Sequence, residues 1–432
     1  MQHSHEALDR PGGFASGGLL KPLRHRDFRV LWSGMAVSLL GDGIFLVAMA
    51  WEAYTLWNAP TALSIVAIGM TVPTVLFLLV GGVVSDRIDR RRVMLAADAV
   101  RALAVGAIAA LVLAGRLEFW ELVALVAVYG IGTAFFTPAF EAVVPDLLPH
   151  EDLPAANSLD QFVRPIALRL AGPLLGGVLV AVSAGLAFTV DALSFVASLA
   201  AVLAIHPRLP VEPEQRLSAR ADVAAGFRFI CRRVWLWGTL VCAAAAYLVF
   251  LGPSEVLLPY VVKNELHASA GALGLVFAAG GVGAIGAAVW MGRRDLPRRE
   301  ITFTYAAWTL ATLAIACYGL ATAAWQLMLV CLVFNALETA GTIVWATIKQ
   351  LHVPRELLGR VSSLDWLISI GLLPISLALT APVAAAVGVR ATLVGAGVLG
   401  AAITVAALLL PGMRDLERAP SAPVRTPAPS VN

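Results

Sequence analysis

The chain has 432 residues, of which 59% are hydrophobic and only 14% are charged, and its formal net charge is +3. Soluble domains are about 45–50% apolar and about 25% charged, so this composition excludes a soluble class. Apolar runs of the roughly 20 residues that a spanning helix needs recur along the sequence, without the short alternating strands of an outer-membrane barrel. The four cysteines lack the spacing of a disulfide framework or a metal site. We therefore expect an all-α membrane protein with neither a bound metal nor a cofactor.

Charge clusters and Gly or Pro residues divide the apolar sequence into twelve predicted spans. In chain order these lie near residues 28–57, 61–85, 93–114, 119–146, 156–182, 184–206, 235–262, 268–291, 301–320, 323–349, 357–388 and 390–411. The predicted parts are a disordered cytoplasmic tail (1–20), a six-helix half (21–206), a linker (207–234), a second six-helix half (235–412) and a disordered cytoplasmic tail (413–432).

The distribution of positive charge predicts the orientation. Most of the 31 Lys and Arg residues lie in the tails and in alternate loops, and the opposite loops hold only Arg116, Lys263 and Arg390. By the positive-inside rule both termini are cytoplasmic, and we expect a multi-pass protein of the cell membrane. Within the linker, apolar and basic residues alternate at helical spacing between Ser218 and Arg233, which predicts an amphipathic helix on the cytoplasmic face.

An internal repeat indicates that the two halves are related. The residues Pro149, Glu151, Leu153, Ser158, Leu159 and Asp160 reappear in the same order as Pro354, Glu356, Leu358, Ser363, Leu364 and Asp365. The repeat aligns the connection after the fourth span with the connection after the tenth. The halves therefore run parallel and are expected to be related by a pseudo-twofold axis along the membrane normal.

A glycine-rich and arginine-rich segment separates the second and third spans. It reads Gly81-Gly82-Val83-Val84-Ser85-Asp86-Arg87-Ile88-Asp89-Arg90-Arg91-Arg92. This segment resembles the loop signature of the major facilitator superfamily, in which a glycine precedes Asp-Arg and several arginines follow. The resemblance implies that Gly82 and Asp86 help to gate the conformational change, together with Arg87 and Arg90. The carboxylate can accept hydrogen bonds at a helix start, and the arginines can anchor to the cytoplasmic face.

The fifth span contains a second motif. Its residues Gly172, Pro173, Gly176 and Gly177 resemble the Gly-Pro motif of antiporter branches of the same superfamily, although Leu168 stands where a further glycine often occurs. Small residues let helices approach closely, and proline bends a helix because it lacks a backbone donor. The alternative interpretation is an ordinary packing kink.

Most of the chain is similar to one branch of that superfamily, which includes the enterobactin exporter, macrolide efflux proteins and actinobacterial multidrug efflux pumps. The similarity rests on His25-Arg26-Asp27-Phe28-Arg29, Leu40-Gly41-Asp42, Thr137-Pro138-Ala139 and Ala156-Asn157-Ser158-Leu159. It implies proton-driven export. The chain departs from many drug/proton antiporters because its fourth span has no arginine in the middle, so the similarity does not imply coupling through that residue.

Charged residues inside spans are candidates for function, because charge in hydrocarbon is costly without a partner or a cavity. Asp42 lies between Gly41 and Gly43 in the first span, and we predict that it carries a proton or binds a cationic substrate group. Arg169 is expected to pair either with Asp191 or with an anionic group of the substrate. Glu255 and Glu338 are the corresponding candidates in the second half.

Other charged residues are spaced to pair on their own helix. Asp98 and Arg101 are three residues apart, and we interpret this pair as mostly structural. Asp160 and Arg164 are four residues apart, and we predict an ion pair that helps to gate the conformational change if it breaks. Asp365 is a further gating candidate, expected near the loop between the second and third spans. Four tryptophans could stack on a planar or cationic ligand, although tryptophan near a span end is more often an interface anchor: Trp51, Trp308, Trp345 and Trp366.

We expect a secondary transporter rather than an enzyme, because the sequence has no GxxxxGK[ST] phosphate loop and no HExxH or GxSxG motif. The predicted activity is proton-coupled efflux of an amphipathic drug, antibiotic or siderophore-like compound by alternating access. Import of a small organic solute and a transport-dead membrane sensor are the alternatives. The expected partners are the substrate, protons and the lipid bilayer, with no nucleic acid, and we expect a monomer.

Overall fold

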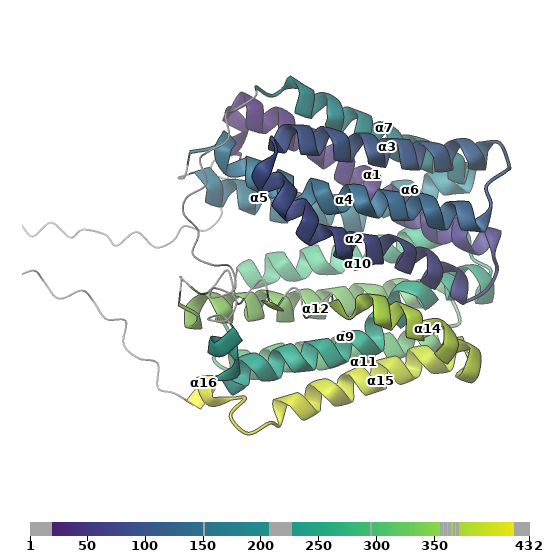
Figure 1. Cartoon of the computed structure of the whole chain (residues 1–432). Coiled ribbons are helices and arrows are strands. Elements are labelled where there is room, and N and C mark those ends of the chain that lie inside the picture. The colour runs from purple at the N-terminus through teal and green to yellow at the C-terminus, as the bar shows by residue number, and fades with distance from the viewer. Residues whose placement is uncertain are drawn as a thin grey trace, which may run out of the picture. The chain divides into compact units, whose positions relative to one another are not determined.

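A computed structural model describes residues 20–149, 152–206, 227–293, 296–354 and 371–418, together with 357, 361, 364, 365 and 368. Within these residues every regular element is a helix (Figure 1). Eleven of the described helical segments are long and apolar enough to cross a membrane, and a shorter apolar helix spans Leu373–Val387. The predicted all-helical membrane fold is therefore confirmed. Part of the predicted span 357–388 and of the linker 207–234, and most of both tails, lie outside the described residues.

Contacts divide the protein into two compact units. The first unit consists of Met1–Met49 and Gly69–Val211, and the second consists of Ala50–Ile68 and Glu212–Asn432. The last turns of the first helix and the first turns of the second helix thus belong with the C-terminal helices.

The helices of the N-terminal part of the chain follow the predicted order. They are η1 (Lys21–Arg24), α1 (Arg26–Leu56), α2 (Thr61–Arg87), α3 (Arg90–Leu113), α4 (Phe119–Leu147), α5 (Leu153–Pro165), η3 (Ile166–Ala171), α6 (Gly172–Val182) and α7 (Ala184–Ala204). Asp89 caps α3 by accepting a hydrogen bond from the Arg91 backbone N–H at 2.9 Å, which fixes the break after Arg87. Within the first unit α3 packs against both α4 and α7 (Figure 1).

The predicted fifth span is built from three consecutive pieces. The π-helical turn η3 lies between α5 and α6, and proline residues flank it at Pro165 and Pro173. Proline cannot donate a backbone hydrogen bond, and π-helical turns inside helices occur frequently at functional sites. The predicted fifth span is therefore interrupted by a π-helical turn between α5 and α6.

The C-terminal helices continue in the same pattern. They are α9 (Val234–Tyr260), η4 (Val261–Glu265), α10 (Ala270–Gly292), α11 (Glu300–Leu320), α12 (Ala324–His352), α14 (Leu373–Val387), α15 (Val389–Leu408) and α16 (Asp415–Arg418). In the second unit α12 packs against α10 and α11, and α15 packs against α9 and α11. The linker is described only from residue 227, where a short helical stretch buries Ile230 beside Trp235 in the core.

The end of α1 is attached to α9 and η4 inside the second unit. Tyr54 Oη donates to the Val256 carbonyl oxygen at 2.6 Å, and Lys263 Nζ donates to the Trp51 carbonyl oxygen at 2.7 Å. The same ammonium group lies 4.5 Å from the centre of the Trp51 ring. These contacts explain why Ala50–Ile68 groups with the C-terminal helices.

Candidate transport site

A polar cluster lies within the first unit and includes Asp42 of α1, whose side chain is half-buried. Tyr129 of α4 donates its hydroxyl hydrogen to Asp42 Oδ1 at 2.7 Å. The Tyr129 ring is held in place by Phe45, which stacks on it with ring centres 4.7 Å apart. Asp42 therefore has a hydrogen-bond partner on α4. This partner could not be predicted from the sequence around Asp42.

Asp98 and Arg101 of α3 form the second part of this cluster. Arg101 donates from Nη2 to Asp98 Oδ1, so the predicted pair is confirmed, and Ser198 of α7 donates to Asp98 Oδ2 at 2.8 Å. The guanidinium lies over the rings of Phe136 and Phe195, at 4.2 Å and 4.5 Å from their centres. Both members of the pair are buried, with 0% and 3% of their surface exposed. The two rings and the Asp98 carboxylate therefore hold the guanidinium in place inside the bundle.

Asp191 of α7 is the third carboxylate of the cluster and is fully buried. Ser194 donates to Asp191 Oδ1 at 3.3 Å, whereas Oδ2 has no hydrogen-bond partner among the described residues. The Cβ that Gly41 lacks would collide with both side chains, so the glycine beside Asp42 lets α7 approach α1. Asp42 interacts electrostatically with Asp191 and with Arg101. Three carboxyl groups thus share the surroundings of one guanidinium.

The antiporter-like motif packs directly against this part of α1. A Cβ on Gly172 would lie 2.6 Å from Gly43 Cα, and a Cβ on Gly176 would lie 3.0 Å from the Ile44 carbonyl oxygen. Pro173 and Gly177 are also buried in α6. Only residues without a side chain permit such close contact between backbones. The two features that the sequence singled out separately, Asp42 and the Gly-Pro motif, therefore meet at adjacent positions of α1.

The described residues show no ion pair between Arg169 and Asp191, one of the two partners predicted for this arginine. Arg169 lies in the π-helical turn η3. Asp191 is buried between α1 and α7, beside Gly41 and Ser194, whereas the Arg169 side chain is exposed. The predicted pair on α5 does form, because Arg164 Nε donates to Asp160 Oδ2 at 3.1 Å.

The predicted gating residues are only partly described. Arg90 donates to Asp146 Oδ2 of α4 at 2.6 Å, which ties the start of α3 to the end of α4. The surroundings of Gly82 and the side chains of Asp86 and Arg87 lie outside what the structure describes. Asp365 binds Lys349 Nζ and accepts a hydrogen bond from Trp345 Nε1 at 3.1 Å, so its described partners lie on α12.

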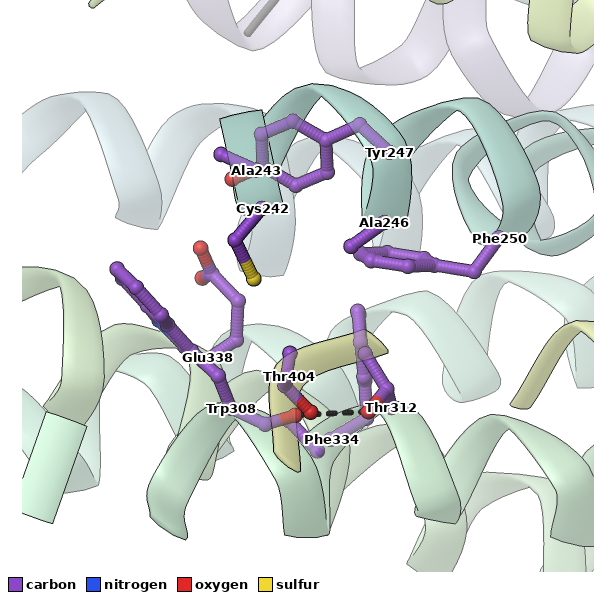
Figure 2. Close-up of a pocket in the computed structure, with 11 residues that line it drawn as sticks. Cys242, Ala243, Ala246, Tyr247, Phe250, Trp308, Thr312, Phe334, Glu338 and Thr404 are labelled. Atoms are coloured by element: carbon purple, nitrogen blue, oxygen red, sulfur yellow. Dashed lines mark hydrogen bonds between the residues drawn. The ribbon is translucent and has the colours of Figure 1, made fainter. Parts of the chain in front are cut away.

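The second unit contains a small cavity between α9, α11, α12 and α15 (Figure 2). Its volume is about 40 Å³. Its wall is formed by Cys242, Ala243, Ala246, Tyr247, Phe250, Trp308, Ala311, Thr312, Phe334, Glu338 and Thr404. Glu338 is the only carboxylate among these lining residues, and its carboxylate points toward Cys242. Glu255, the other candidate of this half, has an exposed side chain on α9 and does not line the cavity.

Comparison with known proteins identifies the family. The sequence matches the transmembrane secretion effector family over residues 17–432. The chain belongs to this family of the major facilitator superfamily. Among the relatives of this secretion effector protein is the multidrug efflux pump Tap of Mycolicibacterium fortuitum, which is 28% identical over 88% of the chain and 94% of the pump. The enterobactin exporter EntS of Citrobacter koseri is 27% identical over 83% of the chain and 84% of the exporter.

Solved structures are similar in fold. A bacterial homologue of the iron transporter ferroportin, in an inward-facing state, superposes with a TM-score of 0.65 at 18% identity over 89% of this chain and 99% of that one. A bacterial homologue of the lysosomal transporter Spinster gives a TM-score of 0.64 at 14% identity over 93% of this chain and 100% of that one. This secretion effector protein is therefore a multi-pass membrane transporter of the major facilitator type, and its homologues are transporters rather than enzymes.

Proposed function

We propose that this protein is a proton-coupled exporter of an amphipathic small molecule, working by alternating access in the cell membrane. The observation that carries the proposal is the polar cluster around Asp42, in which three carboxyl groups interact with the Arg101 guanidinium and Asp42 is also attracted by Arg164. An unbalanced negative charge inside a membrane bundle is costly, and binding a proton removes that cost. The cluster can therefore exist in two charge states that differ by a proton.

The packing around Asp42 supports a link between that proton and movement. Asp42 is followed by Gly43, which touches Gly172 just after the π-helical turn η3. A change in the charge of Asp42 alters its attraction to Arg101 and its hydrogen bond with Tyr129, both on other helices. Smooth glycine surfaces let one helix slide along another, so a local change in charge can favour a different arrangement of α1 and α6.

The direction of transport is inferred from the relatives. The multidrug efflux pump Tap and the enterobactin exporter EntS are both named for export, and each is aligned over more than four fifths of this chain. The macrolide efflux protein A of Streptococcus pyogenes is 24% identical over 90% of the chain and 97% of that protein. Their named substrates differ widely, so we infer only that the substrate is an amphipathic small molecule.

An accumulation assay tests this proposal. Cells with and without the protein are loaded with fluorescent amphipathic compounds of positive, neutral and negative charge, and the assay is repeated after the proton gradient is collapsed. We expect lower accumulation of at least one compound in producing cells, and loss of that difference on collapse. Higher accumulation would instead indicate import, and an unchanged level for the whole panel would favour a membrane sensor. A difference that survives collapse would contradict proton coupling.

A further inference from the structure

The cavity of the second unit combines a carboxylate with aromatic walls. Glu338 of α12 reaches the cavity, and the rings of Tyr247, Phe250 and Trp308 line it (Figure 2). Tyr247 packs edge-on against Phe250 with ring centres 5.5 Å apart. Phe250 packs in the same way against Phe334 at 6.3 Å. The rings therefore support one another around the empty space.

We propose that this cavity binds the ammonium headgroup of an amphipathic organic cation and is a substrate pocket of the transporter. The proposal rests on the proposed function only in assuming that the protein moves a small molecule. It assigns a charge class to the substrate and places its charged end among residues of the second unit, none of which belongs to the polar cluster of the first.

The carboxylate is available to a cation. Glu338 Oε1 accepts one hydrogen bond from Thr342 Oγ1 at 3.0 Å, and Glu338 has no ion-pair partner within the described part of the chain. A carboxylate in a spanning helix normally faces a partner or a hydrated cavity. Here the cavity side of Glu338 offers that place to a ligand.

Three positive charges of the second unit are engaged by partners outside the cavity. Lys349 binds Asp365, Lys263 binds the end of α1, and Arg390 Nε donates to Glu265 at 2.6 Å. The lining residues include no Lys or Arg. The pocket therefore attracts cations and disfavours anions.

The aromatic walls add a second source of affinity. Cations are attracted to the faces of aromatic rings, most strongly to tryptophan, by about 0.5–2 kcal/mol in proteins. The cavity of about 40 Å³ has room for about three water molecules, since each needs roughly 10–15 Å³ by this measure. That size suits a small ammonium headgroup, with the apolar remainder of the molecule extending beyond it.

Equilibrium binding to the purified full-length protein in detergent tests the pocket. The probes are benzyltrimethylammonium and benzylsulfonate, which have similar shapes and opposite charges, and binding is measured by titration calorimetry. We expect the wild type to bind the cation and not the anion. In Glu338→Gln the dissociation constant for the cation should rise at least about tenfold, because the charge pair is lost. Trp308→Leu should raise it about two- to fivefold.

Matched variants control for general damage. Glu300→Gln removes a carboxylate at the start of α11, and Trp325→Leu removes an exposed tryptophan at the start of α12; neither residue lines the cavity. Both should bind the cation as the wild type does. Glu338→Asp keeps the charge and should recover part of the affinity.

A labelling experiment keeps the test valid if Glu338→Gln does not fold. Cys242 lines the cavity, so a protein in which the other three cysteines are replaced by alanine reports on its occupancy. Benzyltrimethylammonium should slow alkylation of Cys242, and benzylsulfonate should not. An unchanged dissociation constant in Glu338→Gln, equal binding of both probes, or absence of protection would overturn the proposal. Because no gradient is present, these results do not depend on proton coupling, and failed gradient-driven transport would count only against the proposed function.

Discussion

The polar cluster of the first unit and the cavity of the second unit handle charge in opposite ways. Around Asp42, which is half-buried, the Tyr129 hydroxyl donates a hydrogen bond, Arg101 supplies a positive charge, and Asp98 and Asp191 are fully buried. Around Glu338 the carboxylate faces open space lined by aromatic rings. A proton can bind to a carboxylate without a cavity, whereas a substrate headgroup needs one, such as the cavity beside Glu338. The comparison supports our proposal that the first unit binds the proton and the second binds the substrate headgroup.

The largest expected effect comes from removing the fixed charge of the polar cluster. Arg101→Leu leaves Asp98 buried without its partner, and breaking one side of a buried ion pair costs about 3–5 kcal/mol. We expect a sharp fall in the yield and the thermal stability of the purified protein, measured by tryptophan fluorescence on heating.

A double variant separates loss of the pair from loss of packing. Asp98→Leu combined with Arg101→Leu leaves neither charge buried alone, so it should recover much of the lost stability. Arg116→Leu, which changes an arginine in the loop between α3 and α4, should behave as the wild type. If the double variant were as unstable as Arg101→Leu, the buried charge would not be the cause.

A smaller effect is expected at the contact between α1 and α6. Gly172→Ala places a Cβ only 2.6 Å from Gly43 Cα, which must push the helices apart. Overpacking of this kind costs about 1–3 kcal/mol. We expect the protein to remain folded but to transport more slowly, measured as the initial rate of efflux at matched expression.

The matched control is Gly106→Ala in α3 of the same unit, where the nearest atom to the new Cβ is Ala192 Cβ at 4.0 Å. This variant should transport at the wild-type rate. Equal rates for Gly172→Ala and Gly106→Ala would show that the close approach of α1 and α6 has no role in transport.

The smallest effect is expected from the hydrogen bond between Tyr129 and Asp42. Tyr129→Phe keeps the ring stacked on Phe45 and removes only the donor, and hydrogen bonds between membrane helices contribute about 0.6–2 kcal/mol. We expect a modest fall in gradient-driven transport. In the Asp42→Ala background, where the acceptor is already absent, the same substitution should lower the thermal stability less than it does in the wild type, because coupled residues give non-additive effects. Fully additive effects would contradict a functional link between the two side chains.

Sequence patterns were sufficient for the architecture because hydropathy, loop charge and proline or glycine positions act locally. The Asp160 and Arg164 pair was also predictable, since a helix brings residues four apart together. The loop motif resembled the right superfamily for the same reason: it is a continuous run of residues.

The candidate site was less predictable because it depends on contacts between distant helices. Nothing in the spacing of Tyr129 indicates that its hydroxyl reaches Asp42, 87 residues away in sequence. Arg169 seemed suited to Asp191 on charge alone, but the packing of α7 against Gly41 buries the carboxylate elsewhere. The sequence identified Glu338 and Trp308 separately, and only the structure brings them to one cavity.

The central claim, that Asp42 carries the coupling proton, is tested most directly in proteoliposomes. Transport of a compound exported by the wild type is measured in two modes: uptake driven by a pH gradient, and exchange of labelled for unlabelled compound without a gradient. Asp42→Asn keeps an acceptor for the Tyr129 hydroxyl but cannot release a proton. We predict that this variant exchanges substrate and loses gradient-driven uptake, whereas Glu300→Gln retains both. Full gradient-driven uptake by a normally produced Asp42→Asn protein would contradict the claim.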